Sequence, residues 1–408
     1  MTMAALPTLD SLDVTGKTVL VRLDLNVPMQ AGRVTDATRI NRVIPTLQYL
    51  MERHAKVVIL SHLGRPKGFD PGQSLAPLVD ALSAALWDRP VKFAPDCVGN
   101  AAKLAVEGAS EGDVVLMENL RFHAEEEKND AEFGRAMACL GDVYVNDAFS
   151  CSHRAHASIV GINPYLPSAA GRLMEEEVSA LESLNSPARP LTAIVGGSKV
   201  STKLDLLGNL INKVDNLVIG GAMANTFLHA QGVKVGASLC EAEMAETARA
   251  IMAKAAGANC RIILPVDAVV AKKFKAHAAS QVCEVTEIPA DGMMLDVGPR
   301  SLLQLQEVIQ GSKTLVWNGP VGAFETAPFD ATTVQIARMV AAASRRGGLH
   351  SVAGGGDTVA ALAHAGLSDE LSYLSTAGGA FLEWLEGKEL PGIAALMNAS
   401  GDAGRKLA

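Results

Sequence analysis

Short runs of β-branched and other apolar residues recur along the chain, and longer segments with helical periodicity separate most of them. The runs that predict strands are Thr18–Leu25, Lys56–Leu60, Val114–Met117, Val143–Val145, Leu191–Val195, Asn216–Ile219, Arg261–Leu264, Thr314–Trp317, His350–Ala353 and Leu371–Leu374. The segments that predict helices include Ile40–Arg53, Leu75–Trp87, Glu241–Ala256 and Thr332–Ser344. Strands that alternate with helices need crossover connections, so the pattern predicts an α/β fold of parallel sheets with helices on both faces.

One amphipathic segment in the middle of the chain marks a boundary between two halves. Its apolar residues recur at helical spacing from Leu173 to Leu184, and proline and glycine bound it on both sides. Gly-Gly pairs occur only after this segment, whereas arginine and histidine follow the predicted strands before it. We therefore predict two lobes with different ligands, residues 1–172 and 186–389, joined by a hinge helix over residues 173–185.

Composition narrows the class of protein. The formal charge of −8 over 408 residues argues against a general binder of nucleic acid or anionic membranes. The six cysteines form no Cys-x-x-Cys pair and have no histidine partners at zinc spacing, so reduced thiols are expected. No signal-peptide pattern opens the sequence, and no apolar run approaches membrane-spanning length. These features predict a cytoplasmic protein without nucleic-acid or membrane partners.

Polar clusters follow four predicted strands of the first half, where parallel α/β sheets bind their ligands. The clusters are Asp24-Leu25-Asn26 with Arg39, Ser61-His62-Leu63-Gly64-Arg65, Glu118-Asn119-Leu120-Arg121, and Ser152-His153-Arg154-Ala155-His156. One arginine after a strand is more often a solvated loop charge, but four clusters at one sheet edge indicate a small, multiply negative ligand. The histidines lack the spacing of a metal site and are expected either to donate hydrogen bonds to the same ligand or to bond to neighbouring loops.

Glycine-rich strand ends characterise the second half. Gly196-Gly197-Ser198-Lys199 follows a strand and leads into a predicted helix, in which Lys203 is expected one helical turn beyond Lys199. Gly354-Gly355-Gly356-Asp357-Thr358 has the same context. Such turns bring backbone N–H groups and a helix N-terminus close to phosphate, and Asp357 adds a carboxylate suited to Mg²⁺. Neither a P-loop nor the dinucleotide fingerprint is present. Together with the strand end Trp317–Glu325, these fragments suit a nucleotide.

The complete set of motifs closely resembles phosphoglycerate kinase, nearly end to end and in the order of that family. The motifs are Asp24-Leu25-Asn26-Val27-Pro28, Ser61-His62-Leu63-Gly64-Arg65-Pro66, Glu118-Asn119-Leu120-Arg121-Phe122, His153-Arg154-Ala155-His156, Gly196-Gly197-Ser198-Lys199-Val200, Trp317-Asn318-Gly319-Pro320-Val321-Gly322 and Gly354-Gly355-Gly356-Asp357-Thr358. The resemblance implies two Rossmann-like lobes joined by a helix, with 3-phosphoglycerate or 1,3-bisphosphoglycerate on the first and Mg-ADP or Mg-ATP on the second. It also implies a monomer in which residues 390–408 pack back on the first lobe.

The resemblance also assigns roles to residues. The implied binders of phosphoglycerate are Asp24, Leu25, Asn26, Arg39, His62, Leu63, Gly64, Arg65, Arg121 and Arg154. The implied binders of the nucleotide are Gly197, Ser198, Lys199, Lys203, Gly221, Asn318, Glu325, Gly355, Gly356, Asp357 and Thr358, with Asp357 on the metal. The implied catalytic residues are Arg39, Lys203, Gly378 and Gly379. The chain departs from the family at Ala377, where many members have glycine, and this substitution is costly only if the position needs a positive φ.

The implied reaction suits the residues present, because neither an ADP phosphate oxygen nor a carboxylate carries a proton that a base must remove. Three rival functions remain open. A kinase with a hydroxyl acceptor would need a carboxylate base, for which Asp24 is the candidate. A dehydrogenase is disfavoured by the missing fingerprint, and a sensor without catalytic activity could retain all the binding residues.

Overall fold

The computed structural model describes residues 6–399, which form two compact units. One unit contains the described residues up to Ser179 together with those from Glu389 onward, and the other runs from Ala180 to Lys388. Of the expected return segment 390–408, residues 400–408 lie outside the described part of the chain. No helix within residues 6–399 has both the length and the apolar character that a membrane span requires.

The first unit is built on a parallel sheet of six strands in the order β5-β6-β4-β1-β7-β8. The strands are β1 (Thr18–Arg22), β4 (Lys56–Leu60), β5 (Val91–Ala94), β6 (Val114–Met117), β7 (Val143–Asn146) and β8 (Ser168–Ala170), and a small hairpin pairs β2 (Met29–Gln30) with β3 (Arg33–Val34). Strands β6 and β7 are buried at every residue, as expected when helices cover both faces of a sheet.

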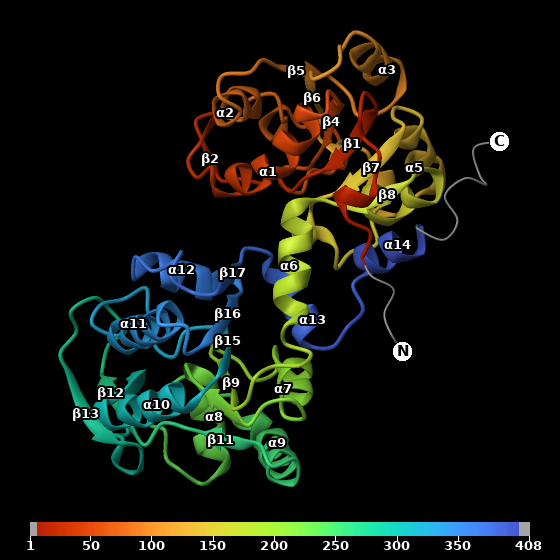
Figure 1. Cartoon of the computed structure of the whole chain (residues 1–408). Coiled ribbons are helices and arrows are strands. Elements are labelled where there is room, and N and C mark those ends of the chain that lie inside the picture. The colour runs from red at the N-terminus through yellow and green to blue at the C-terminus, as the bar shows by residue number, and fades with distance from the viewer. Residues whose placement is uncertain (1–5, 400–408) are drawn as a thin grey trace. The chain divides into compact units, whose positions relative to one another are not determined.

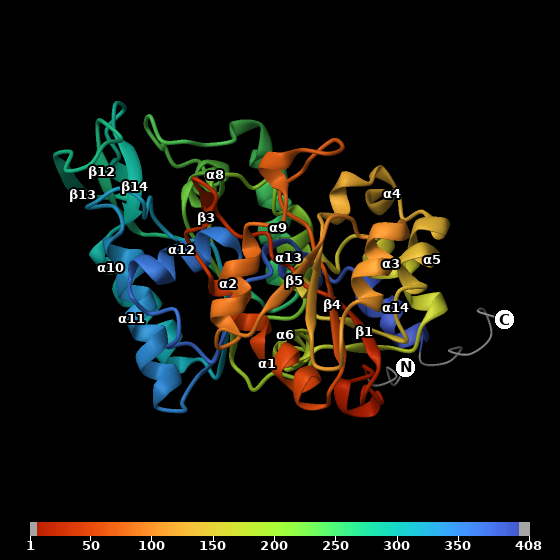
Figure 2. The same cartoon turned by 90° about the horizontal axis from the view of Figure 1, so that it is seen from above.

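Helices cover both faces of this sheet, with α1 and α2 on one side and α3 and α5 on the other (Figure 1, Figure 2). The helices are α1 (Thr38–Glu52), α2 (Leu78–Ala85), α3 (Gly99–Glu107), α4 (Ala124–Glu127), α5 (Ala131–Ala138) and α14 (Pro391–Ala399). In α1 the buried residues Ile40, Val43, Leu47 and Leu50 recur every three or four positions, which places them on one helix face against the core. Helix α14 packs beside β8, and the N–H of Gly392 donates to the carbonyl of Ser152 at 2.9 Å.

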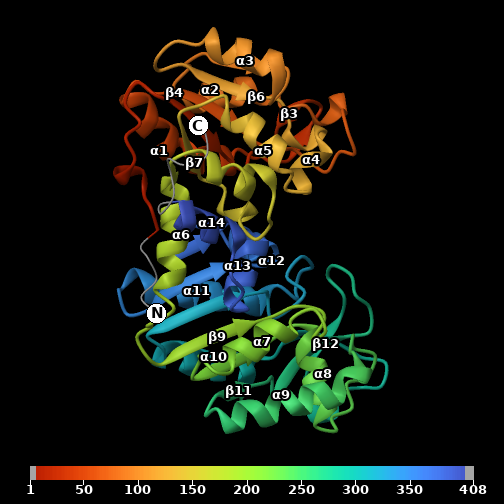
Figure 3. The same ribbon diagram turned by 90° about the vertical axis from the view of Figure 1, so that its right-hand side faces the viewer.

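The second unit contains another parallel sheet of six strands, in the order β11-β10-β9-β15-β16-β17. These strands are β9 (Leu191–Val195), β10 (Asn216–Ile219), β11 (Arg261–Ile263), β15 (Thr314–Asn318), β16 (His350–Gly354) and β17 (Tyr373–Ser375). The helices are α7 (Leu204–Leu210), α8 (Ala222–Ala230), α9 (Ala245–Gly257), α10 (Pro299–Gly311), α11 (Ala331–Arg345), α12 (Gly356–His364) and α13 (Gly378–Leu385). Helices α7, α8 and α9 cover one face and α10 and α11 the other (Figure 1, Figure 3). Trp317 of β15 is fully buried in the core cluster that includes residues of α10 and α11.

The two parallel sheets confirm the predicted fold class, with some differences in detail. Strand β1 ends at Arg22 rather than at the predicted Leu25, and β17 begins at Tyr373 rather than at Leu371. The sequence analysis did not predict the antiparallel sheet β13-β12-β14, formed by β12 (Asp267–Ala271), β13 (Ser280–Glu284) and β14 (Met293–Val297). The residues of β13 are all exposed or only partly buried, so this strand lacks the apolar run by which the others were found.

The helix predicted over residues 173–185 is observed as α6, which is shorter and covers Arg172–Glu182. Its apolar residues Met174, Val178 and Leu181 are buried, in agreement with the predicted amphipathic pattern. The helix ends before Leu184 because Ser183, whose hydroxyl donates to the carbonyl of Ala180 at 2.6 Å, begins a turn.

Candidate functional site

The predicted anion-binding residues of the first unit follow the carboxyl ends of β1, β4, β6 and β7, at one edge of the parallel sheet. Asp24 and Asn26 come after β1, His62 and Arg65 after β4, and Arg121 lies in η3 (Leu120–Phe122), a short 3₁₀ turn after β6. Arg39 lies in the first turn of α1. The fold thus brings these distant parts of the sequence to the edge where such sheets bind ligands.

Asp24 is fully engaged by its neighbours. Its Oδ2 accepts hydrogen bonds from Nη1 of Arg39 at 2.7 Å and from the hydroxyl of Ser150, and its Oδ1 accepts from the N–H of Asn26 at 3.0 Å. Burial opposes ionisation of this carboxyl, but its charged and hydrogen-bonding neighbours outweigh burial and hold the pKa of Asp24 below its ordinary value. Asp24 is therefore an ionised partner that orients Arg39, and its lowered pKa makes it a weak proton acceptor.

Asn26 and Arg121 together fix the loop after β4. The side-chain oxygen of Asn26 accepts from the N–H of Gly64 at 2.9 Å, and Nη1 of Arg121 donates to the carbonyl of Gly64 at 2.5 Å. Leu25 and Leu63, also predicted as binders, are buried at the bases of their loops. Both the N–H and the carbonyl of Gly64 are thus hydrogen-bonded. These bonds fix the backbone after β4 and thereby position the next residue, Arg65.

His62 is held in one tautomer by Arg22, the last residue of β1. Nη2 of Arg22 lies 3.1 Å from Nδ1 of His62, and a guanidinium can only donate, so Nδ1 accepts and Nε2 carries the proton. Burial and then the charge of Arg22 hold the pKa of His62 well below its ordinary value, so the ring is neutral. His62 consequently presents an N–H donor.

The hydrogen-bonded side chains that hold Arg22 in place were not predicted from the sequence. Nε of Arg22 donates to the hydroxyl of Ser158 at 2.8 Å, and that hydroxyl donates to the buried carboxylate of Glu126 at 2.5 Å. The sequence feature that could have indicated this network is the arginine at the end of the apolar run of β1. In the structure Arg22 is fully buried. A buried charge requires such a partner network.

The remaining predicted arginines differ in exposure. Arg121 is 7% exposed, and burial lowers the pKa of its guanidinium, which nevertheless stays charged at neutral pH. Its Nε lies 3.4 Å from Glu127 without forming an oriented hydrogen bond. Arg65 is exposed, and Arg154 is partly buried with its Nε donating to His153 at 3.2 Å. These arginines still have N–H groups to offer a ligand.

In the second unit, Lys203 lies beneath the glycine turns. Its Nζ donates to the carbonyl of Gly196 and to the side-chain oxygen of Asn318, both at 2.6 Å. Burial lowers the pKa of Lys203 to about 8, against the attraction of Asp357. We predicted Lys203 one helical turn beyond Lys199, which is wrong, since α7 begins only at Leu204 and Lys203 is its N-cap residue. The turn at residues 201–202 folds the chain back instead and brings the ammonium group beneath the loop.

The loop from Gly354 to Thr358 is tied to the end of β15. The side-chain amide of Asn318 donates to the carbonyl of Gly354 at 2.8 Å, and the hydroxyl of Thr358 accepts from the N–H of Gly319 at 2.7 Å. Gly355 has φ of 98°, and a Cβ there would lie 2.5 Å from the Asn318 amide nitrogen. Only glycine fits that conformation and that contact, and helix α12 begins immediately after it at Gly356.

A cavity of about 400 Å³ adjoins these turns. Five residues predicted to bind the nucleotide line it, namely Gly197, Ser198, Gly221, Glu325 and Asp357. Lys203, Asn318 and Thr358 form the hydrogen-bonded layer next to these turns, whereas Lys199 is exposed and outside the lining. The cavity also has apolar walls that the sequence analysis missed, including Leu239, Phe274, Leu295 and Val321. An apolar slot beside glycine turns can hold a planar base next to its phosphates.

Comparison with known proteins shows the family of the chain. The family model described as phosphoglycerate kinase matches residues 9–388. The chain is 61% identical over 391 residues to the phosphoglycerate kinase of Granulibacter bethesdensis, covering 95% of this chain and 98% of that protein. It is 60% identical over 397 residues to that of Methylobacterium radiotolerans, covering 97% and 99%. The chain belongs to the phosphoglycerate kinase family.

Solved structures of this family share the fold. Phosphoglycerate kinase from Coxiella burnetii is similar with a TM-score of 0.89 and 42% identity, covering 97% of this chain and 99% of that one. The enzyme from Pyrococcus horikoshii OT3 is similar with a TM-score of 0.80 and 30% identity over the same shares. This family membership makes the chain a glycolytic kinase whose phosphate acceptor is a carboxyl group.

The departure from the family at Ala377 carries no backbone strain. Ala377 is the N-cap residue of α13 and has φ of −95° and ψ of 30°, a conformation that any L-residue adopts. Its N–H is bonded to the hydroxyl of Ser375 at 3.2 Å. Gly378 and Gly379, predicted as catalytic, form the first turn of this helix, so their N–H groups lie at its positive end.

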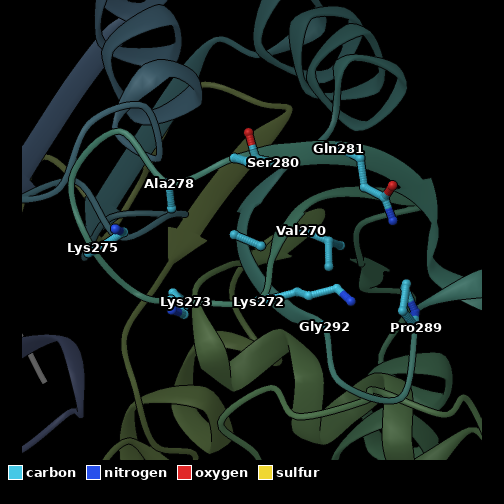
Figure 4. A pocket seen from close by; sticks show the side chains of 11 residues that line it. Val270, Lys272, Lys273, Lys275, Ala278, Ser280, Gln281, Pro289 and Gly292 are labelled. Carbon is cyan, nitrogen blue, oxygen red and sulfur yellow. The ribbon is translucent and has the colours of Figure 1, made fainter.

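A second cavity of the same unit lies on the antiparallel sheet and is lined by none of the predicted site residues (Figure 4). Its volume is about 450 Å³, and its lining includes Lys272, Lys273 and Lys275 beside Val270 and Pro289. Lys272 forms an ion pair of 2.8 Å with Asp291, in which both side chains are largely exposed. Such solvated pairs contribute little to stability, and no candidate role is assigned to the residues that line this cavity.

Proposed function

We propose that the chain catalyses reversible transfer of the acyl phosphate of 1,3-bisphosphoglycerate to ADP, giving 3-phosphoglycerate and ATP. The observation that carries this proposal is the state of Asp24. Both of its oxygens accept hydrogen bonds, one of them from Arg39, and its pKa is lowered, so the only predicted candidate for a general base is a weak proton acceptor. A hydroxyl acceptor would need that base, whereas a carboxylate acceptor does not.

The phosphoglycerate is proposed to bind at the basic strand ends of the first unit. Arg65, Arg121 and Arg154 would hold its anionic oxygens, because a guanidinium can offer two parallel N–H donors. His62, whose proton is on Nε2, would donate one further hydrogen bond, and Asn26 would fix the backbone at Gly64. Arg39, oriented by Asp24, would be directed toward the transferring phosphoryl group.

The nucleotide is proposed to bind in the cavity of the second unit, with its base against the apolar wall and its phosphates at the glycine turns. Glu325 would accept a hydrogen bond from the ribose. Asp357, the residue proposed to bind the metal, lines the cavity from the first turn of α12. Its carboxylate is a suitable ligand for a hard cation such as Mg²⁺. Mg²⁺ bound there with the nucleotide would neutralise phosphate charge during transfer.

The residues of the chain would act by positioning and by charge neutralisation. An oxygen of the terminal ADP phosphate attacks the acyl phosphorus, the bond from phosphorus to the acyl oxygen breaks, and the carboxylate leaves without a proton transfer. Lys203, Arg39 and the N-terminus of α13 at Gly378 and Gly379 would stabilise the charge on the equatorial oxygens. No residue has to form a covalent intermediate.

The deciding experiment is a coupled assay of the purified chain with ATP, Mg²⁺ and 3-phosphoglycerate, in which the 1,3-bisphosphoglycerate formed is consumed with oxidation of NADH. We expect activity that depends on both substrates and on Mg²⁺ and is lost in Lys203→Ala. Binding of both substrates without turnover would identify a sensor instead. Oxidation of NADH without the coupling enzyme would identify a dehydrogenase. The monomeric state and the cytoplasmic location stay predictions from the sequence.

A further inference from the structure

A cluster of three metal-ligating side chains lies outside the proposed substrate site, at the edge of the first sheet. Asp96 and Cys97 follow the end of edge strand β5, and His123 follows η3. A carboxylate oxygen of Asp96, Sγ of Cys97 and a ring nitrogen of His123 all lie within 4.8 Å of one another. The three residue types are those that commonly bind transition metals, and they are brought together from two separate segments.

The cluster is held together before any ligand binds. Oδ1 of Asp96 accepts from the N–H of Cys97 at 2.7 Å and lies 2.8 Å from Nε2 of His123. The ring of His123 packs against that of Phe133, with 5.2 Å between centroids. Cys97 is fully buried, and its Sγ lies within 4.8 Å of the ligand atoms of Asp96 and His123. The side chains of Asp96 and His123 are 40% and 30% exposed, which leaves the opposite side open to water.

The donor set selects the class of metal. Sulfur, imidazole nitrogen and one carboxylate oxygen suit Zn²⁺ and similar ions, whereas Mg²⁺ prefers an all-oxygen shell. A tetrahedral zinc site with bonds of about 2.0–2.3 Å keeps its ligand atoms about 3–4 Å apart, so the ion would replace the hydrogen bond of 2.8 Å between Asp96 and His123 as these side chains rotate apart. We propose that Asp96, Cys97 and His123 bind one Zn²⁺-like ion, with water at the fourth position.

The second candidate cluster does not serve this purpose. Asp24, His62 and Cys151 also have ligand atoms within 4.8 Å of one another. In that cluster, however, the guanidinium group of Arg39 lies 2.7 Å from Asp24 and that of Arg22 lies 3.1 Å from His62. A cation there would meet two neighbouring guanidinium groups, which would repel it.

The proposed ion would join the loop after β5 to the segment around η3, which carries Arg121, a proposed phosphoglycerate binder. His123 follows Arg121 by two positions, and its N–H donates to the carbonyl of Leu120 at 3.1 Å. A metal bound to Cys97 and His123 would therefore fasten the loop after β5 to η3. We expect slower hydrogen exchange of the backbone amides at residues 96–98 and 120–123 when the ion is bound.

The test is a titration of the full-length chain with Co²⁺, a spectroscopic substitute for Zn²⁺, after treatment with EDTA and in the presence of excess Mg²⁺. We expect one equivalent of Co²⁺ to give a cobalt–thiolate charge-transfer band and the visible bands of a tetrahedral ion. The band should be absent in Cys97→Ala, and His123→Gln should weaken binding by at least about tenfold. Zn²⁺ should displace the Co²⁺ and raise the melting temperature of the natural sequence but not of His123→Gln.

Cys139→Ser and His54→Gln are the matched controls, because they change a free, exposed cysteine and a histidine away from the cluster. Both should bind Co²⁺ as the unchanged chain does. If Cys97→Ala does not fold, the partly exposed His123 still allows the test. A thiolate band that survives in Cys97→Ala, disappears in Cys139→Ser or is unaffected in His123→Gln would overturn the proposal.

Discussion

Arg39 is a basic residue of the first unit whose direction is set by two neighbours. It is held by Asp24 at 2.7 Å and by the carbonyl of Asn26 at 3.1 Å, yet a third of its side chain stays exposed. We expect Arg39→Ala to lower kcat by roughly two to four orders of magnitude, because one contact to the developing charge is worth about 3–5 kcal/mol. Arg39→Lys should restore little, since a point charge cannot replace the planar fork.

Steady-state kinetics at matched ionic strength compare the loss of kcat in Arg39→Ala with the effects of substituting the other arginines. Arg65→Ala should mainly raise KM for 3-phosphoglycerate, because it would remove binding that is equal in the ground and transition states. Arg33→Ala, in the exposed strand β3, is the control and should change neither constant. Similar increases in KM for Arg39→Ala and Arg65→Ala, without a selective loss of kcat, would mean that the arginines only form a positive basin.

Lys203 should give the reaction a pH limit on the alkaline side. Because burial lowers the pKa of Lys203 to about 8, the ammonium group of the free enzyme loses its charge as the pH rises above that value. We expect kcat/KM for the nucleotide to fall above about pH 8. In Lys203→Arg the overall activity should be lower and the fall should move to higher pH, because a guanidinium stays charged. Lys234→Arg, an exposed control to which no role is assigned, should leave the profile unchanged.

At the scale of elements, Asp147 connects the end of β7 to the start of α6. Its Oδ1 accepts from the N–H of Met174 at 3.0 Å, and a Cβ on Gly171 would lie only 2.4 Å from its carboxyl carbon. The side chain is fully buried, and burial raises the pKa of Asp147 from 3.8 to about 6. The folded chain therefore binds this proton more tightly than the unfolded chain does.

This residue should make the free energy of unfolding fall as the pH rises. The contribution of Asp147 to the free energy of unfolding is highest below about pH 4, declines as the pH rises through 6 and stays low above that value. The total decline is up to about 3 kcal/mol, because the two pKa values differ by about two units. We expect Asp147→Asn, which can still accept from Met174, to be more stable relative to the natural sequence at pH 7.5 than at pH 4.5. Urea unfolding measures the difference, with the exposed Asp88→Asn as control. An equal difference at both pH values would contradict the expectation.

The turn into α12 should tolerate no side chain at Gly355. With φ of 98° and only 2.5 Å to the Asn318 amide nitrogen, Gly355→Ala must strain the backbone and break the bond from Asn318 to Gly354. We expect a loss of stability of about 1–3 kcal/mol and a larger KM for ADP. Gly311→Ala is the control, since it has open space and no positive φ. Thermal unfolding and nucleotide titration distinguish the two, and equal behaviour would show that the turn can relax.

At the scale of the whole molecule, the proposed reaction requires the two substrates to meet in line with water excluded. Because the phosphoglycerate residues belong to one compact unit and the nucleotide residues to the other, we expect the units to move together about α6 and its flanks. Small-angle scattering should give a smaller radius of gyration with both ligands than with either alone. An unchanged radius would leave α6 as a static connection.

The sequence by itself determined the repeated strands and helices, and thus the two parallel sheets. Apolar runs such as Val114–Met117 and Leu191–Val195 reappear with the predicted bounds, because strands buried on both faces admit few other residues. Strand β13 escaped prediction because it is largely exposed, and α6 is shorter than predicted because Ser183 begins a turn. The family motifs supplied the candidate residues, since each motif is local in the sequence.

Only the tertiary structure decided how those residues are used. In the folded chain both oxygens of Asp24 accept hydrogen bonds, and Arg22 fixes the tautomer of His62. Lys203 is partly buried beneath the glycine turns. It also brought Cys97 to His123, a pair that no sequence spacing indicates. The physical reason is that hydrogen bonding, desolvation and metal ligation depend on distances of a few ångströms, which periodicity along the chain does not encode.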